Sequence, residues 1–242
     1  MSCFLGKVET KVSILSQKTL LSMPRRKSSK YSHNTGNPFV VQPLHILYET
    51  IKWQRQSSYF ANQNPIVLEL ACGRWEYTLG MARHYPWNNY VGVDIKWERI
   101  HTGASLAQKE WLPNVGFLRA IIQNLADYFD ENEIQDMWIV HPDPRPKNSD
   151  EKRRLTHERF LKIYEDILRP NSLLRLKTDD EELYQYSLWS LKKRGRALVD
   201  ATQDLYSSKL LDDHQGIRTK YEDMFVKRGK TIKYAKRISP KK

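Results

Sequence analysis

Acidic side chains stand at the ends of two apolar stretches, where they could contact a ligand. Glu69 and Gly73 lie around the end of the stretch 66–70, and Asp94 ends the stretch 90–93, 25 residues after Glu69. A glycine at such a turn lets the backbone approach a ligand closely, and the helix that follows presents free N–H groups. Glu69 and Asp94 together indicate a nucleoside ligand, because a carboxylate there can accept both ribose hydroxyls. An ordinary turn at Gly73 and a helix cap at Asp94 remain the alternative.

A second candidate site is the proline-rich stretch 141–147, which reads His-Pro-Asp-Pro-Arg-Pro-Lys. Each proline fixes φ and removes a backbone donor, so the loop is stiff and holds the carboxylate of Asp143 in place. The charged run 150–154 follows and ends in Arg153 and Arg154, cations that could hold a phosphate backbone. A structural proline turn beside a solvated charged face is the alternative, but the combination favours a functional loop.

Apolar stretches alternate with helical patterns along the middle of the chain. We expect strands at 66–70, 90–93, 115–118, 137–140 and 173–176, and helices at 76–84, 97–109, 124–129, 156–168 and 180–193, with Thr156 as a cap. Strands that alternate with helices of about a dozen residues predict a doubly wound, mostly parallel sheet. Ligands of such sheets bind at the carboxyl ends of the strands, where Glu69, Asp94 and Asp143 stand.

The positive charge of the chain is concentrated at its two ends. The 242 residues carry a net charge of +12; residues 1–30 contribute +6 and residues 227–242 contribute +8. Basic ends around a nearly neutral body suit a polyanionic partner, because cations that meet phosphates release counterions. We expect residues 1–37 to form a basic, flexible arm and residues 38–242 to form one domain with a basic C-terminal end. A solvated tail would give the same charge pattern.

Cysteine usage and hydropathy exclude several classes of protein. The chain has two cysteines, Cys3 and Cys72, without neighbours at metal-ligand spacing, so we expect no disulfide framework and no metal site. No apolar run approaches the roughly 20 residues that a membrane helix needs. We therefore expect a cytoplasmic protein that does not contact a membrane, as a monomer or a weak homodimer.

Seven short motifs, in order, resemble the bacterial tRNA (guanine-N7-)-methyltransferase family. They are Leu68–Gly73, Gly92–Lys96, Pro142–Lys147, Lys152–Thr156, Phe160–Leu161, Leu176–Asp179 and Thr219–Glu222. The resemblance spans residues 38–238. It implies a Rossmann-like class I fold dependent on S-adenosylmethionine, with a mostly parallel seven-stranded sheet. The implied reaction is methylation of N7 of the variable-loop guanine, position 46, in tRNA.

The resemblance also implies roles for individual residues. Asp143 is the expected catalytic carboxylate. The expected cofactor contacts are Glu69, Gly73, Asp94, Gln123 and Asp143. The expected tRNA contacts are Lys147, Arg153, Arg154, Asp179, Thr219, Tyr221 and Glu222.

The chain departs from the family pattern at three places. Ala71 and Trp75 replace two glycines of the first loop, Ile121 stands where an acidic cofactor contact is usual, and Arg145 replaces a tryptophan. Gln123 could substitute for the missing acid. Trp75 and Ile121 motivate one alternative, a noncatalytic tRNA-binding protein with a degraded cofactor loop. A methyltransferase for small molecules or proteins would leave the basic ends unused, and missing glycines disfavour an NAD-dependent oxidoreductase.

Overall fold

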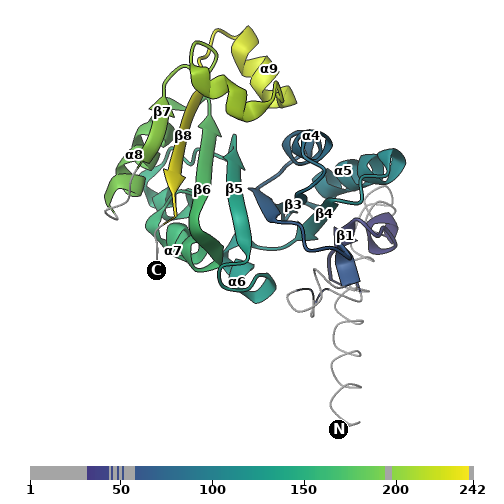
Figure 1. The fold of residues 1–242 in the computed structure, drawn as a ribbon. Coiled ribbons are helices and arrows are strands. Elements are labelled where there is room, and N and C mark those ends of the chain that lie inside the picture. The colour runs from purple at the N-terminus through teal and green to yellow at the C-terminus, as the bar shows by residue number, and fades with distance from the viewer. Residues whose placement is uncertain are drawn as a thin grey trace.

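One large sheet organises the chain in a computed structural model, which describes residues 32–193 and 198–239 except 44, 46, 47, 49, 50 and 52–57. In that part of the chain eight strands pair in the order β1-β4-β3-β2-β5-β6-β8-β7 (Figure 1). The order reverses at β2, which lies between β3 and β5 and is parallel to both. Such a reversal opens a crevice at the carboxyl ends of the strands, where ligands of doubly wound folds bind.

The first half of the sheet is built from alternating strands and helices, and all of its neighbouring strands are parallel to one another. Its elements are β1 (Val40–Val41), β2 (Ile66–Leu70), α4 (Glu76–His84), β3 (Asn89–Asp94), α5 (Trp97–Glu110) and β4 (Val115–Arg119). The sheet therefore has one strand more than the seven expected, because the two residues of β1 pair with the outer side of β4. This pair is too short to leave a strand pattern in the sequence.

The second half adds two parallel strands and an antiparallel pair. Its elements are η2 (Ile122–Asn124), α6 (Leu125–Tyr128), β5 (Ile134–Val140), η3 (Asn148–Arg153), α7 (Glu158–Ile167), β6 (Leu168–Thr178), α8 (Glu181–Lys193), β7 (Leu198–Thr202), η4 (Lys209–His214), α9 (Lys220–Lys227) and β8 (Lys233–Ile238). Strand β8 lies between β6 and β7 and is antiparallel to both. Helix α9 stands above the tips of β5 and β6 (Figure 1).

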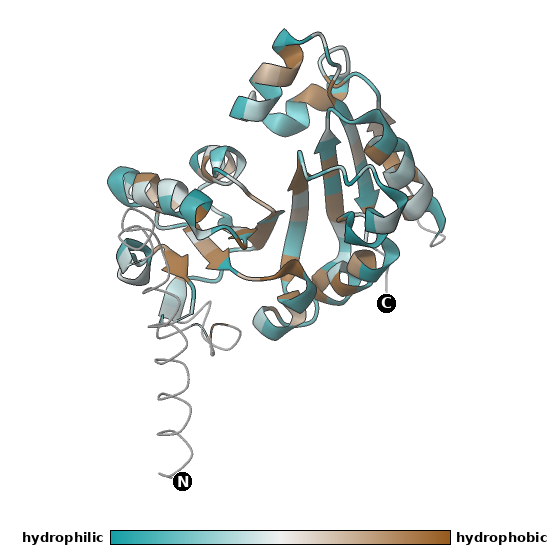
Figure 2. Cartoon of the chain, turned by 180° about the vertical axis from the view of Figure 1, so that it is seen from behind, coloured by the Kyte–Doolittle hydropathy of each residue, from teal (hydrophilic) through white to brown (hydrophobic). Residues whose placement is uncertain are grey.

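Apolar side chains alternate between the two faces of the sheet and form a core on each. In β2, Leu68 and Leu70 belong to the core shared with Phe160 and Leu161 of α7, whereas Val67 belongs to the core shared with α4 and α5. Figure 2 shows hydrophobic residues concentrated in strands of the parallel part of the sheet and many hydrophilic residues on the helices. Burial on both sides explains why the strands read as continuous apolar runs rather than as alternating ones.

Two local expectations are corrected. Helix α7 is capped by His157, whose side chain accepts a hydrogen bond from Arg159 N–H, while the Thr156 hydroxyl is buried against Ser187 at 2.7 Å. The end of the expected arm belongs to the folded body: Asn34 donates to the Trp97 carbonyl at 3.0 Å, and Asn37 is likewise buried. The rest of that arm, residues 1–31, lies outside the described residues.

The basic C-terminal end is partly built into the sheet. In β8, Arg237 is buried and pairs with Glu165 at 3.0 Å, and Lys236 pairs with Asp213 at 2.9 Å. These cations stabilise the strand and are not free to meet a polyanion. No helix among the described residues is long and apolar enough to cross a membrane.

Candidate active site

The loop after β2 follows a backbone path that glycine would favour at alternate positions. Ala71, Gly73 and Trp75 have φ of 55°, 54° and 87°, all in the left-handed region. Such a conformation costs roughly 1–2 kcal/mol for a residue with a Cβ. The loop therefore has a backbone path of the kind that glycine favours at both replaced positions, and the chain carries the strain at Ala71 and Trp75.

The side chain of Trp75 is accommodated by a glycine on the neighbouring helix. A Cβ placed on Gly103 of α5 would lie 2.5 Å from the Trp75 Cβ and 2.7 Å from the ring of Phe117. The indole therefore packs against α5, with its Nε1 buried. The absence of a side chain at Gly103 makes room for the bulk that the sequence places in the loop.

Asp94 at the tip of β3 fastens this loop. Its carboxylate accepts hydrogen bonds from Gly73 N–H at 3.0 Å and Lys96 N–H at 2.7 Å, and Arg99 lies 3.8 Å away. A carboxylate has about four acceptor positions, so two remain for hydroxyl groups of a ligand. Asp94 can thus both shape the loop and accept from a ribose.

Glu69 is buried near the carboxyl end of β2, just before the same loop. Its carboxyl accepts hydrogen bonds from Thr78 of α4, from the backbone N–H at 2.7 Å and from the hydroxyl. Burial raises the pKa of Glu69 to about 8, against the opposing effect of these two hydrogen bonds. The group therefore ties β2 to the first turn of α4, and it does so with a proton that it retains near neutral pH.

The residues around the loop fit S-adenosylmethionine. A Cβ placed on Gly73 would find only the Ala71 carbonyl oxygen within 4 Å, so space is open beside this backbone. A cavity of about 730 Å³ adjoins it and is lined by Arg74, Trp75, Glu76, Glu98, Arg99, Thr102, Lys220 and Tyr221. This volume lies within the range of about 300–1,000 Å³ of sites for small molecules. Gln123, the remaining expected cofactor contact, is exposed in η2 after β4.

Asp143 lies exposed in the proline-rich loop after β5. Its side chain is 61% accessible, and its carboxylate lies 3.2 Å from the guanidinium of Arg145. The Arg145 N–H also donates to it at 3.3 Å, which closes a tight turn with Arg145 at a φ of 51°. The loop therefore presents a carboxylate whose nearest cation is the residue that replaces the family's tryptophan. Lys147 is exposed at the end of the same loop.

Arg154 anchors this loop from beneath. Its guanidinium is buried, donates to the Arg145 carbonyl at 3.1 Å and pairs with Glu182 of α8 at 2.7 Å. It also stacks over the ring of Tyr186 at 4.5 Å. Arg154 is thus placed to hold the loop rather than to meet a phosphate, whereas Arg153 is exposed and pairs with Asp150 at 3.1 Å.

His141 joins the loop to two further segments of the expected substrate site. Its ring nitrogens lie 3.5 Å from Asp179 at the end of β6 and 3.6 Å from Glu222 of α9. Burial lowers the pKa of His141, but the two carboxylates outweigh this effect and raise it overall. The sequence indicated Asp179 and Glu222 separately, but it could not show that a histidine stands between them.

Glu222, in the first turn of α9, is fully buried. It pairs with Lys177 of β6 at 2.7 Å and accepts from the Tyr206 hydroxyl at 2.5 Å. It also completes the capping box of α9 with Thr219. Burial would raise the pKa of Glu222, but the neighbouring His141 ring and the charge of Lys177 lower it to about 2. Glu222 and Thr219 therefore position α9 over the sheet.

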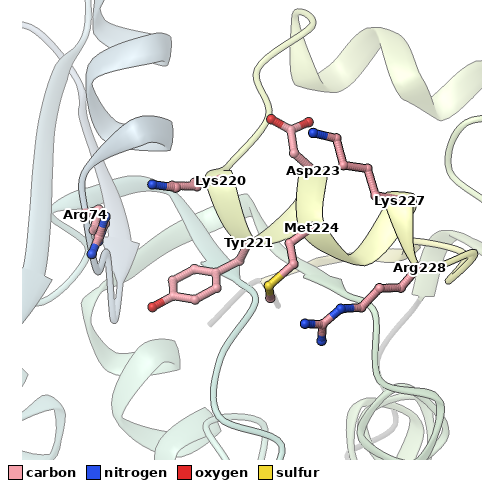
Figure 3. A pocket seen from close by; sticks show the side chains of 7 residues that line it. All are labelled: Arg74, Lys220, Tyr221, Asp223, Met224, Lys227 and Arg228. Carbon is pink, nitrogen blue, oxygen red and sulfur yellow. The ribbon is translucent and has the colours of Figure 1, made fainter.

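Tyr221 is the member of this segment that faces outward. Its side chain projects from α9 into a cavity on the side of Arg74, together with Met224 and Arg228 (Figure 3). The pattern of the sequence marked Tyr221 with its neighbours, but gave no sign that its role in the structure differs from theirs. No group of acidic, histidine and cysteine residues that could hold a metal ion occurs in the described part of the chain.

Sequence similarity to known proteins shows the family of this chain. Residues 63–235 match a family described as "Putative methyltransferase". A tRNA (guanine-N(7)-)-methyltransferase of Cytophaga hutchinsonii is 38% identical over 216 residues, which are 88% of this chain and 97% of the relative. The chain belongs to the tRNA (guanine-N(7)-)-methyltransferase family. A second member, from Christiangramia forsetii, is 39% identical and covers 87% of this chain and 96% of its own.

Solved structures agree with the fold of this family member. The 16S rRNA methyltransferase KamB superposes with a TM-score of 0.57 at 16% identity and covers 80% of this chain and 93% of that chain. An antibiotic-related methyltransferase gives a TM-score of 0.55 at 13% identity, over 74% of this chain and 89% of that chain. The predicted α/β methyltransferase fold is thereby confirmed.

Proposed function

We propose that the protein transfers a methyl group from S-adenosylmethionine to N7 of a guanine, that of position 46, in tRNA. The observation that supports this most strongly is the near full-length identity with enzymes of that name, 38% over 97% of one relative. The geometry agrees, because the strained glycine-type loop, Asp94 and the Asp143 loop all meet the crevice beside β2. A cytoplasmic location fits the buried free thiol of Cys72.

The cofactor side of the proposed site is the loop after β2 and the tip of β3. Gly73 and its neighbours would face the amino acid part of the cofactor, and Asp94 would accept from its ribose, with Gln123 near the base. S-adenosylmethionine supplies an electrophilic methyl group on a sulfonium sulfur. Glu69 would act from behind, since its hydrogen bonds to Thr78 hold the first turn of α4 against the loop.

The catalytic demand on the protein is modest. Guanine N7 carries an in-plane lone pair, so no proton has to be removed before it reacts, and no strong general base is required. Positive charge develops on the guanine ring during transfer. Asp143 would stabilise this charge and accept hydrogen bonds from the N1–H and the N2 amino group, and Asp179 would assist from β6. The carboxylate of Asp143 is exposed, so the guanine can reach it when the tRNA binds.

Most of the remaining catalysis is positioning. Well-oriented intramolecular reactions gain about 7–11 kcal/mol from proximity. Three segments have to keep their relative positions for this gain: the Asp143 loop, the end of β6 and α9. Arg154 holds the first, and the contacts of His141 with Asp179 and Glu222 link it to the other two. Lys147 and Arg153 are exposed beside the loop and would contact phosphates, Arg153 in competition with its ion pair to Asp150.

Methyl transfer to unmodified tRNA tests the proposal directly. Labelled S-adenosylmethionine is incubated with wild type, Asp143→Ala and the control Asp127→Asn, an exposed carboxyl in α6. The product is mapped by chain cleavage at N7-methylguanine. We expect cleavage in the variable loop, a kcat about 100–1,000-fold lower for Asp143→Ala, and little change for the control. Binding of tRNA without transfer by the wild type would instead identify a noncatalytic tRNA-binding protein.

A further inference from the structure

A second cavity adjoins the candidate active site on the outer side of α9. Its volume is about 630 Å³, and it is lined by Arg74, Lys220, Tyr221, Asp223, Met224, Lys227 and Arg228 (Figure 3). Three of these residues, Arg74, Lys220 and Tyr221, also line the cavity beside the cofactor loop. They therefore form a wall shared by the two spaces, and whatever occupies the second cavity lies next to the candidate active site.

The charge of this cavity is strongly one-sided. Its four cations form no ion pair with any residue that the structure describes; they are Arg74, Lys220, Lys227 and Arg228. The single acid, Asp223, is paired with Arg218 at 2.9 Å, outside the lining. The exposed Arg83 of α4, by contrast, pairs with Glu110 at 2.7 Å. Uncompensated cations gathered around one space favour an anionic occupant with more than one charge.

A stripe of one aromatic, one thioether and one cationic side chain runs along the same side of α9. Tyr221, Met224 and Arg228 are spaced as i, i+3 and i+7, so they share one face of the helix, and their side chains point the same way in Figure 3. Tyr221 is 45% exposed. An exposed aromatic ring beside a thioether and a guanidinium is a surface on which a nucleobase can stack. Charge for phosphates and a stacking surface for bases together indicate single-stranded nucleic acid.

The helix that carries this stripe is rigidly placed. Its first turn is fixed by the capping box of Thr219 and Glu222, and Glu222 is bound to Lys177 of β6 at 2.7 Å. Tyr221 thus has buried, charge-paired neighbours on the inner side of the helix and faces the cavity on the outer side. A base stacked on it would be held at a fixed distance from the Asp143 loop and β6.

We infer that the RNA strand flanking the target guanine lies in this cavity, with the neighbouring base stacked on Tyr221 and its phosphates held by Lys227 and Arg228. The inference rests on the proposed methylation of tRNA and adds the path of the strand. It adds Lys227 and Arg228, at the far end of α9, to the tRNA contacts expected of the first turn of the helix.

Binding and methylation of a tRNA transcript test the charged part of the surface. Lys227→Gln/Arg228→Gln is compared with Lys162→Gln/Lys192→Gln, two exposed cations on α7 and α8. Loss of two single-strand phosphate contacts lowers the slope of log K against log salt by about 1.4 and weakens binding about 10-fold near 0.15 M salt. We expect this for the first pair alone, with affinity for S-adenosylhomocysteine unchanged in both. Equal losses in both pairs, or none in the first, would overturn the inference.

A double-mutant cycle tests the stacking. Tyr221→Leu and Tyr221→Phe are each assayed with normal tRNA and with transcripts that carry an abasic site on either side of the target guanine. If a base stacks on Tyr221, one of the two abasic transcripts should bind to the wild type about 5-fold or more weakly than normal tRNA does. Tyr221→Leu should then bind that transcript no more weakly than the wild type does. Tyr221→Phe should behave as wild type. Additive losses would refute the stacking. If the wild type failed to methylate tRNA at all, the proposed function would fail, whereas normal methylation with unaltered variants would refute only the path of the strand.

Discussion

The buried carboxyl of Glu69 should make the stability of the protein fall as the pH rises. Its pKa is about 8 in the folded protein against an ordinary value of 4.5, chiefly because of burial. A carboxyl whose pKa is raised by folding makes its full contribution to the free energy of unfolding at pH values below 4.5. This contribution is lost progressively as the pH rises from 4.5 to above 8. The difference of about 3.5 units corresponds to at most about 5 kcal/mol, of which about 3 kcal/mol is lost by pH 7.

The variant Glu69→Gln isolates this effect, because an amide resembles the protonated carboxyl and can still accept from Thr78. Urea unfolding of wild type and variant at pH 5, 7 and 9 gives the free energies of unfolding. We expect the two proteins to be similar at pH 5 and the variant to be more stable at pH 9, by a few kcal/mol. Asp166→Asn, at an exposed carboxyl of α7, is the control and should show no such trend. A difference between Glu69→Gln and wild type that does not vary with pH would refute the reasoning.

Three further predictions concern packing and buried charge. Gly103→Ala should lower the free energy of unfolding by about 1–3 kcal/mol because its Cβ would meet Trp75, and by clearly less in a Trp75→Gly background; equal costs in both backgrounds would contradict this contact. Glu222→Gln should destabilise by about 3 kcal/mol at pH 7, and thermal melts should show the difference shrinking as the pH falls from 4.5 towards 2, the range in which a carboxyl with a lowered pKa loses its contribution. Arg154→Met should cost about 2 kcal/mol in denaturant unfolding and raise KM for tRNA more than Arg153→Met, since Arg154 donates to the Arg145 carbonyl and holds the loop; a larger rise in KM for Arg153→Met would show that binding of tRNA depends on Arg153 more than on this support of the loop.

Much of the parallel sheet could be predicted from the sequence, because its strands are buried on both faces and stand out as apolar runs. The expected strand 90–93 is β3, Asn89–Asp94, and the expected helix 76–84 is α4. The antiparallel end was missed. In β8 the residues facing the core include Lys233 and Arg237, whose charges are compensated by partners distant in sequence, so no apolar pattern marks the strand.

The candidate site, like the sheet, could be predicted from the sequence only in part. Glu69, Asp94 and Asp143 could be singled out because each lies at or just after the carboxyl end of a strand, and strand ends gather at one edge of the sheet. The distinction between Arg153 and Arg154 could not, since adjacent residues with the same side chain differ only in what the fold places beside them. Trp75 looked incompatible with a cofactor loop because the compensating residue, Gly103, lies 28 positions away in the chain.

The position of β8 has a consequence for the order in which the protein is assembled. Among the described strands β8 is the last to leave the ribosome, yet it lies between β6 and β7, and β7 pairs with no other strand. The segment that carries α9 connects β7 to β8, so α9 cannot be held over the tips of β5 and β6 from both ends until β8 has been added. The cofactor loop, made more than a hundred residues earlier, can form first. A nascent chain should therefore acquire its cofactor side before its substrate side, and the completed enzyme is reached only with the final strand.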